Sequence, residues 1–226
     1  MLDINEFPSI EEYKKKFFSD DKMSLLLAKV VSLSMALLGL IMTITTYIEG
    51  NPKMVAVTEY SKMLAEALGK DIKTQQEIYL FALLHDIGKI GIPDGIINKR
   101  DKLTDEEYSE IKKHPEIGYE ILKSITTLPN LKIGVRWHHE RMDGKGYPDG
   151  LKGDDIPEFA RIISVADAYD AMTSNRSYRD SLPQDIVRSE IIKKSGTQFA
   201  PEVAEKMIEI IDNDKDFKLR EKPSQR

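Results

Sequence analysis

The residues of this chain that are best suited to chemistry are four histidines and the carboxylates near them. The sequence contains no cysteine, so a metal site must use histidine nitrogens and carboxylate oxygens. A single histidine is more often a structural residue than a ligand, and only the setting of several together changes that interpretation. The candidates in such settings are His85, Asp86, His114, His138, His139 and Asp167.

Two adjacent pairs and one isolated carboxylate favour a metal site. Asp86 follows His85 at the predicted end of a helix. Adjacent ligands point in different directions, so the carboxylate can bridge two ions while the imidazole binds one. His139 follows His138 directly, and Asp167 stands in an apolar segment where an unpaired carboxylate would be costly to bury. Two ions held by nitrogen and oxygen would suit phosphoester hydrolysis, with iron, manganese or zinc preferred over copper(I).

Short motifs around these residues resemble those of the HD-GYP branch of the HD phosphohydrolase superfamily. Residues 85–89 read HDIGK and residues 141–148 read RMDGKGYP, which resemble the two signatures of that branch. The flanking segments that agree are HPEIG at 114–118, HHER at 138–141, VADAYDAMT at 165–173 and GTQF at 196–199. Each motif alone is a weak signal, and their number and order over residues 60–211 carry the resemblance.

The resemblance implies a helical fold, a centre of two or three divalent metal ions with iron or manganese favoured, and hydrolysis of cyclic di-GMP to pGpG or GMP. By position, the implied ligands are His85, Asp86, His114, His138, His139 and Asp167, with Glu49 where some members have an extra glutamate. Asp86 would bridge two ions. Lys89 would neutralise charge on the phosphate or protonate the leaving group, so both residues are expected to act in catalysis.

The resemblance also implies a substrate pocket. Its expected residues are Gly146, Tyr147, Asp170, Arg176 and Arg179. Forked guanidinium groups suit phosphate and guanine. Structural alternatives stay open: Tyr147 could only pack its loop, the two arginines could be surface charges, and Lys89 could be a solvated loop residue. Trp137, the single tryptophan, is expected in the core.

One position departs from the family pattern. Alignment on the apolar residues between 60 and 69 places Lys53 where these domains usually carry a further histidine. A lysine ammonium cannot bind a metal ion at pH 7. The alternative to an active phosphodiesterase is therefore a degenerate domain that binds cyclic di-GMP or partner proteins with little or no turnover. An HD phosphohydrolase for another nucleotide is a third interpretation, which the Gly-Tyr-Pro loop at residues 146–148 disfavours.

Helices are the elements expected to position these residues. Apolar residues recur at helical spacing over about residues 54–68, 74–85, 131–141, 158–172, 184–194 and 201–212. Gly69 is a predicted C-cap, and Thr104 with Glu107 predicts a capping box that opens another helix. Pro115 suits the first turn of the helix that follows. With no strand pattern, the sequence predicts an all-α, HD-domain helical bundle over residues 50–212.

A helical N-terminal segment, residues 1–49, and a charged tail, residues 213–226, are expected to flank this domain. Residues 30–48 carry no charge, and a buried or dimer-forming helix is favoured there over a membrane span. The expected partners are cyclic di-GMP and a second copy of the chain. The net charge of −5 argues against binding a nucleic-acid polymer. No signal peptide is apparent, so a cytoplasmic location is expected, with a membrane anchor through residues 30–48 as the alternative.

Overall fold

The computed structural model describes residues 52–99, 101–123, 125, 130–174, 180–215 and 219, with side chains from residue 56 onward. The chain divides into two compact units, residues 1–51 and 52–226, and the described residues all belong to the second. The predictions for residues 1–49, for Glu49, and for Arg176 and Arg179 therefore lie outside the described residues. Lys53 lies in a described helix, but its side chain does not belong to the described part.

Helices make up the fold, which confirms the all-α prediction. They are α3 (Pro52–Ala67), α4 (Ile72–Leu84), η2 (Ile87–Gly91), α5 (Asp94–Ile97), α6 (Asp105–Ile111), α7 (His114–Leu122), α8 (Leu131–Trp137), η3 (Gly153–Asp155), α9 (Glu158–Thr173), α10 (Gln184–Lys194) and α11 (Pro201–Asn213). Among the described residues the only β-type pairing is an isolated bridge between Ser195 and Phe199.

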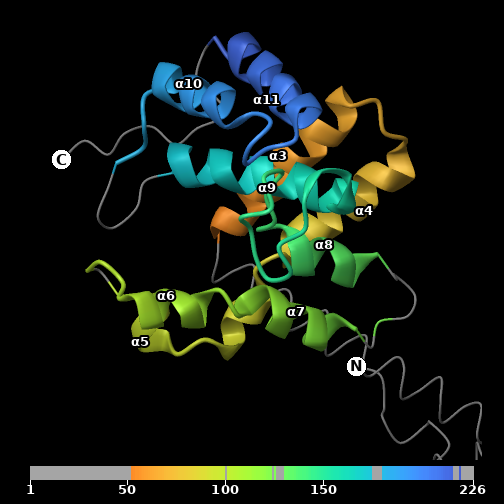
Figure 1. Cartoon of the computed structure of the whole chain (residues 1–226). Helices are drawn as coiled ribbons and strands as arrows, with labels where there is room; N and C mark the ends of the chain where they lie inside the picture. The colour runs from red at the N-terminus through yellow and green to blue at the C-terminus, as the bar shows by residue number, and fades with distance from the viewer. Residues whose placement is uncertain are drawn as a thin grey trace, which may run out of the picture. The chain divides into compact units, whose positions relative to one another are not determined.

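The helix α9 lies at the centre of the bundle and packs against α3, α4, α8, α10 and α11 (Figure 1). Its apolar residues lie on several faces rather than one stripe, as expected of a helix that is covered on most sides. Ile162, Ile163, Val165, Ala166 and Tyr169 on α9 are all fully buried. The ring of Tyr169 meets that of Tyr60 on α3 edge to face, at a centroid distance of 4.8 Å. This packing fixes α9 as the wall against which the site is built.

Several predicted helix ends are confirmed because local chemistry sets them. Gly69 follows α3 with a φ of 71°, the left-handed conformation that glycine adopts without strain. Thr104 and Glu107 form the predicted capping box at the start of α6. The short helices η2, α5 and η3 were not predicted, because they lie in segments whose glycines and prolines indicate turns.

The helix expected over residues 131–141 is too long, since α8 ends at Trp137. The reason is the His138 ring, whose Nδ1 lies 2.7 Å from the carbonyl oxygen of Val135. A continuing helix would give that carbonyl to the amide of residue 139, so the side chain competes with the next helical bond. The chain turns instead, and Glu140 closes the turn by donating its amide to Trp137 at 3.0 Å. This turn brings His138 into the interior and leaves His139 partly buried beside it.

In the part of the chain that the structure describes, no helix is long and apolar enough to cross a membrane. The uncharged run at residues 30–48 is not part of it.

Candidate metal centre and adjoining pocket

Four of the six predicted ligands inside the described part converge closely. Asp86, His114, His138 and His139 each offer one ligand atom, and these atoms lie within 4.8 Å of one another. His85 adjoins them, because its Nε2 lies 3.3 Å from Oδ2 of Asp86. They come from four places in the chain: the end of α4, the residue before η2, the start of α7 and the turn after α8.

Asp167, the sixth predicted ligand, reaches the cluster from the middle of α9. Its Oδ1 lies 4.0 Å from Nε2 of His85, and its side chain is 29% exposed. The sequence suggested a carboxylate buried among apolar residues. The structure instead turns the side chain away from the core and into the wall of a pocket. All six predicted ligands thus face one region of the molecule.

One recurring bond fixes the protonation of three histidine rings. In each of them Nδ1 faces the backbone carbonyl three residues earlier: His85 at 2.5 Å, His114 at 2.7 Å and His138 at 2.7 Å. A carbonyl can only accept, so each Nδ1 carries the proton. The lone pair of the neutral ring is then on Nε2, the atom that points into the cluster. These carbonyls lie at the ends of helices, where they have no helical partner.

The contacts between ligand atoms call for a cation. Nε2 of His114 lies 3.2 Å from Nε2 of His138 and 3.2 Å from Oδ1 of Asp86. With both Nδ1 atoms protonated, these are contacts between two lone-pair acceptors, which repel unless a positive charge lies between them. The donor set therefore fits a divalent metal ion of the kind that nitrogen and oxygen ligands hold. A metal ion bound here would act as a Lewis acid toward phosphate and lower the pKa of a bound water.

The electrostatic environment keeps His138, His139 and Asp86 in the ligating form. Burial lowers the pKa of His138 well below its usual value and that of His139 to about 4. Burial would raise the pKa of Asp86, but the positive charges of His85 and Lys89 hold it well below its usual range. At neutral pH these two histidines are therefore neutral and Asp86 is ionised, as ligation requires.

In the metal-free protein, the pKa of His85 is shifted in the opposite direction from those of His138 and His139. Burial lowers its pKa, but the carboxylates of Asp86 and then Asp167 outweigh that effect and raise the pKa to about 9. The metal-free protein thus stores one proton on His85, and binding of a cation at the carboxylates favours its release.

Two glycines allow the ligand segments to approach. A Cβ on Gly88 would lie 1.9 Å from the carbonyl oxygen of His114 and 2.5 Å from the amide nitrogen of Gly118. Only glycine therefore lets η2 touch the first turns of α7, the contact that brings Asp86 to His114. A Cβ on Gly146 would lie 2.5 Å from Cα of Glu140. Gly146 is needed for this close approach of the loop to the chain after His139.

Tyr147 follows Gly146 and lies against His139, one of the predicted ligands. Its ring stacks on that of His139, with centroids 4.8 Å apart and planes 29° from parallel. The bond from Tyr147 to Pro148 is cis. Burial raises the pKa of the Tyr147 hydroxyl, so it stays protonated and can donate a hydrogen bond. Tyr147 both packs against His139 and lines the pocket beside it.

The cluster opens on a pocket of about 630 Å³, of the size that small ligands occupy. Its wall includes His139, Tyr147 and Asp167, so the predicted metal site and the predicted substrate loop share it. The positively charged residues that line it are Lys112, Arg141, Lys145 and Lys194. Tyr108 and Met172 add apolar surface. Positive charge beside aromatic and apolar surface suits an anionic ligand that carries planar bases.

A second hollow of about 830 Å³ shares Tyr108 with this pocket and extends along α5 and α6. Lys89 lines it, and the Nζ of Lys89 also bonds the Oδ2 of Asp86. Lys89 therefore lies next to the cluster, with 39% of its side chain exposed. Of the other expected substrate residues, Asp170 does not line either cavity. It is 4% exposed and accepts a hydrogen bond from the Ser174 hydroxyl at 2.8 Å.

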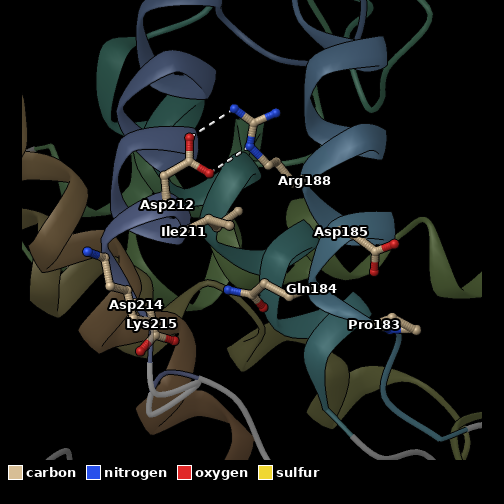
Figure 2. A pocket seen from close by; sticks show the side chains of 8 residues that line it. All are labelled: Pro183, Gln184, Asp185, Arg188, Ile211, Asp212, Asp214 and Lys215. Carbon is tan, nitrogen blue, oxygen red and sulfur yellow. Dashed lines mark hydrogen bonds and ion pairs between the residues drawn. The ribbon is translucent and has the colours of Figure 1, made fainter.

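Sequence reasoning missed part of the pocket wall. Lys112 and Lys194 come from separate segments, and no motif links them to the site. Lys145 stands in the RMDGKGYP motif, but no role was predicted for it. Trp137 was expected in the core, but it is only partly buried and its Nε1 donates to Asp149 at 2.6 Å. A third hollow, about 490 Å³ in volume, lies between α10 and α11 and contains none of the predicted site residues (Figure 2).

Comparison with known proteins adds a family and several relatives. The family model described as HD domain matches residues 26–203. A cyclic di-GMP phosphodiesterase of Thermotoga maritima is 43% identical over 165 residues, which cover 72% of this chain and 45% of that protein. The cyclic di-GMP phosphodiesterase response regulator RpfG of Xanthomonas campestris is 40% identical, over 65% of this chain and 39% of its own length. A 3'3'-cGAMP-specific phosphodiesterase of Vibrio cholerae is 39% identical, over 68% of this chain and 30% of that protein.

Solved structures share the fold. Bd1817, a HDG"Y"P protein from Bdellovibrio bacteriovorus, aligns with a TM-score of 0.60 and 25% identity, over 71% of this chain and 51% of that one. The HD domain of the L. monocytogenes phosphodiesterase PgpH aligns with a TM-score of 0.53 and 20% identity, over 75% of this chain and 94% of that one. The chain spans less than half the length of the curated relatives that it matches.

Proposed function

Because the chain belongs to the HD domain family and carries the motifs of its HD-GYP branch, we propose that it is a metal-dependent phosphodiesterase that opens cyclic di-GMP. One observation carries the proposal. The convergent histidines and Asp86 open directly on a pocket lined by positive charge and by the Tyr147 ring. A cyclic dinucleotide has the two features that such a pocket accommodates, anionic phosphates and planar bases.

The side chains of this chain divide the work of hydrolysis. Asp86 and the histidines would hold the metal ions, for which we propose two or three, iron or manganese. Lys89, which bonds Asp86, places an ammonium beside the cluster and offsets the negative charge that builds on the phosphate in the transition state. In the reaction, a water oxygen forms a bond to phosphorus, and the bond between phosphorus and the ribose 3′ oxygen breaks. The 3′ oxygen leaves with a proton.

The substrate follows from the names of the relatives together with the pocket. Those relatives are named for cyclic di-GMP or for 3'3'-cGAMP. Both ligands have two phosphodiester bonds and two purines, so the same pocket chemistry fits both. Opening of one bond in cyclic di-GMP gives pGpG, and a second hydrolysis gives GMP.

Lys53 bears on whether the domain turns over its ligand. If its ammonium lies at the position of a missing histidine ligand, it repels the nearest ion and weakens the centre. The expected consequence is looser metal binding, or binding of cyclic di-GMP without turnover. A Lys53→His substitution supplies a neutral nitrogen donor at pH 7 and would restore the ligand.

The experiment is a turnover assay on the purified full chain after loading with Fe²⁺ or Mn²⁺. Cyclic di-GMP and 3'3'-cGAMP are supplied separately, and the linear products are separated by chromatography. We expect conversion of cyclic di-GMP to pGpG. No turnover by the wild type, with turnover by Lys53→His, would assign the chain to the degenerate alternative. Inactivity of both metal-loaded proteins on both nucleotides would refute the proposed function.

The cellular setting of the activity remains a proposal from the sequence. We propose a cytoplasmic enzyme that forms a homodimer through residues 30–48. The supporting observation is the uncharged run with its serine and threonine residues, which suit a protein interior better than lipid.

A further inference from the structure

A buried carboxylate lies directly beneath the Gly-Tyr-Pro loop. Glu140 follows the ligand His139 in sequence and is 2% exposed. Its Oε1 accepts the backbone amides of Asp149 at 2.7 Å and Gly150 at 3.0 Å. Both amides donate to the same carboxyl oxygen, so one buried side chain satisfies two backbone donors of the loop. Glu140 therefore fixes residues 149–150, the C-terminal end of the loop, to the segment that contains the predicted ligands His138 and His139.

The side chain of Asp149 holds the same end of the loop through a second set of hydrogen bonds. Its carboxylate accepts hydrogen bonds from Nε and Nη2 of Arg136, each at 2.8 Å, and from Nε1 of Trp137 at 2.6 Å. This is a bidentate arginine–carboxylate pair with a third donor added. Arg136 and Trp137 are the last two residues of α8, directly before the ligand His138. Residues 136–140 thus hold both the metal ligands and the end of the loop.

Residues 141–143, at the N-terminal end of the loop, make a separate set of hydrogen bonds. Asp143 donates its amide to the carbonyl of Thr197 at 2.8 Å, and its carboxylate pairs with Arg141 at 2.7 Å. Arg141 also reaches the side chain of Gln198 at 3.1 Å. These bonds tie the loop to the segment after α10. Tyr147 lies between the two sets of attachments, with its ring on His139.

We propose that Glu140 and Asp149 are positioning residues, which brace the loop so that Tyr147 stays over His139 and forms the pocket wall against the nucleotide. The brace acts on the loop and not on the metal ligands, so its loss should weaken substrate binding while the metal centre stays intact. The part that concerns substrate rests on the proposed function. The part that concerns the loop stands on the contacts alone.

The test compares variants of the full chain. Glu140→Ala removes the acceptor of two amides, whereas Glu140→Gln keeps a carbonyl oxygen in the same place and should rescue the loop. Asp149→Ala removes the acceptor of Arg136 and Trp137, and Asp149→Asn retains one carbonyl acceptor should the alanine variant fail to fold. The control is Asp212→Ala, which breaks a matched bidentate pair with Arg188, at 2.6 and 2.9 Å, away from the site (Figure 2).

Two readouts do not depend on activity. Lys145 is an exposed residue of the loop, so trypsin cleavage after it reports loop opening. We expect cleavage to be about tenfold faster in Glu140→Ala and Asp149→Ala, the change that about 1.4 kcal/mol produces. Trp137 is the only tryptophan, and its emission maximum should shift in Asp149→Ala. Asp212→Ala should change neither quantity.

Kinetics and metal content complete the test. In both alanine variants we expect KM for cyclic di-GMP to rise by about tenfold, with a much smaller change in kcat and unchanged metal per chain. Unchanged cleavage and unchanged KM would overturn the proposal. So would a fall in metal content that accompanies the loss of activity, since the residues would then act through the ligands. If neither the wild type nor Lys53→His turns over either nucleotide, the proposed function fails, while cleavage and emission still decide whether Glu140 and Asp149 brace the loop.

Discussion

At the residue scale, the chemistry of the site depends on which nitrogen of each histidine carries the proton. His85, His114 and His138 each use Nδ1 to satisfy a carbonyl at the end of a helix. The same bond that completes the secondary structure leaves Nε2 for a metal ion. A carbonyl at the end of a helix thus orients each of these three rings.

Substitution of Asp86 and substitution of Lys89 should have different effects on metal binding and on kcat. Asp86 contacts His85, His114 and Lys89, so Asp86→Ala removes the central ligand and should abolish metal binding. Lys89→Ala removes only a positive charge beside the cluster, so metal should be retained while kcat falls by about 10²–10³, as for loss of one transition-state donor. Elemental analysis with steady-state kinetics measures both. Equal metal content in Asp86→Ala and the wild type would contradict the assignment.

At the element scale, close contacts between short segments bring the ligands together. The 3₁₀ helix η2 touches α7 only because residue 88 has no side chain. The sequence places the ligands on helices but does not show this contact, because a glycine in a turn is compatible with many neighbours. In contrast, the capping box at Thr104 and the cap at Gly69 are local, so the sequence predicts them.

A single methyl group at this contact should therefore disturb the centre. Gly88→Ala would place Cβ 1.9 Å from the His114 carbonyl, so η2 and α7 must separate. We expect a loss of about 1–3 kcal/mol of stability and weaker metal binding, because Asp86 moves away from His114. The matched control is Gly95→Ala, where nothing lies within 4 Å of the new Cβ. Equal metal affinity in both variants would show that the contact does not position Asp86.

A site residue could be predicted from the sequence when it stands in a short motif with a known role. All six predicted metal ligands inside the described part stand in short motifs, and the structure brings their side chains to one region. The brace was missed, because Asp149 and Glu140 meet only after the loop folds back and no spacing rule relates a carboxylate to two backbone amides. Asp170 shares a motif with Asp167, but the structure buries it against Ser174. The end of α8 was also missed, since a side chain and not the backbone pattern sets it.

At the scale of the whole molecule, the cluster couples stability to pH and to metal. His139 has a pKa of about 4 in the metal-free fold, below the value near 6.5 of an unfolded histidine. As pH falls below 6.5 the unfolded chain binds protons that the fold rejects, so stability is lost. His85 has a pKa of about 9, so its contribution is complete below 6.5 and is lost as pH rises through 9.

We therefore expect the metal-free protein to be most stable near pH 6.5 and to become less stable on both sides. Thermal unfolding in the presence of a chelator, between pH 4 and pH 9.5, measures this profile. In His85→Gln the loss on the alkaline side should be smaller, because the stored proton is absent. A midpoint that rises steadily from pH 6.5 to pH 9 in the metal-free wild type would be inconsistent with the arrangement of charges described above.

The central claim is that the convergent histidines and Asp86 hold the ions that hydrolyse a cyclic dinucleotide. The most direct test is to titrate the metal-free full chain with Fe²⁺ or Mn²⁺ and to follow bound metal and cyclic di-GMP turnover in the same samples. We expect turnover to appear as metal fills the site and to reach a plateau near two ions per chain. Full turnover in the metal-free protein, or a fully metal-loaded protein that leaves cyclic di-GMP intact, would contradict it.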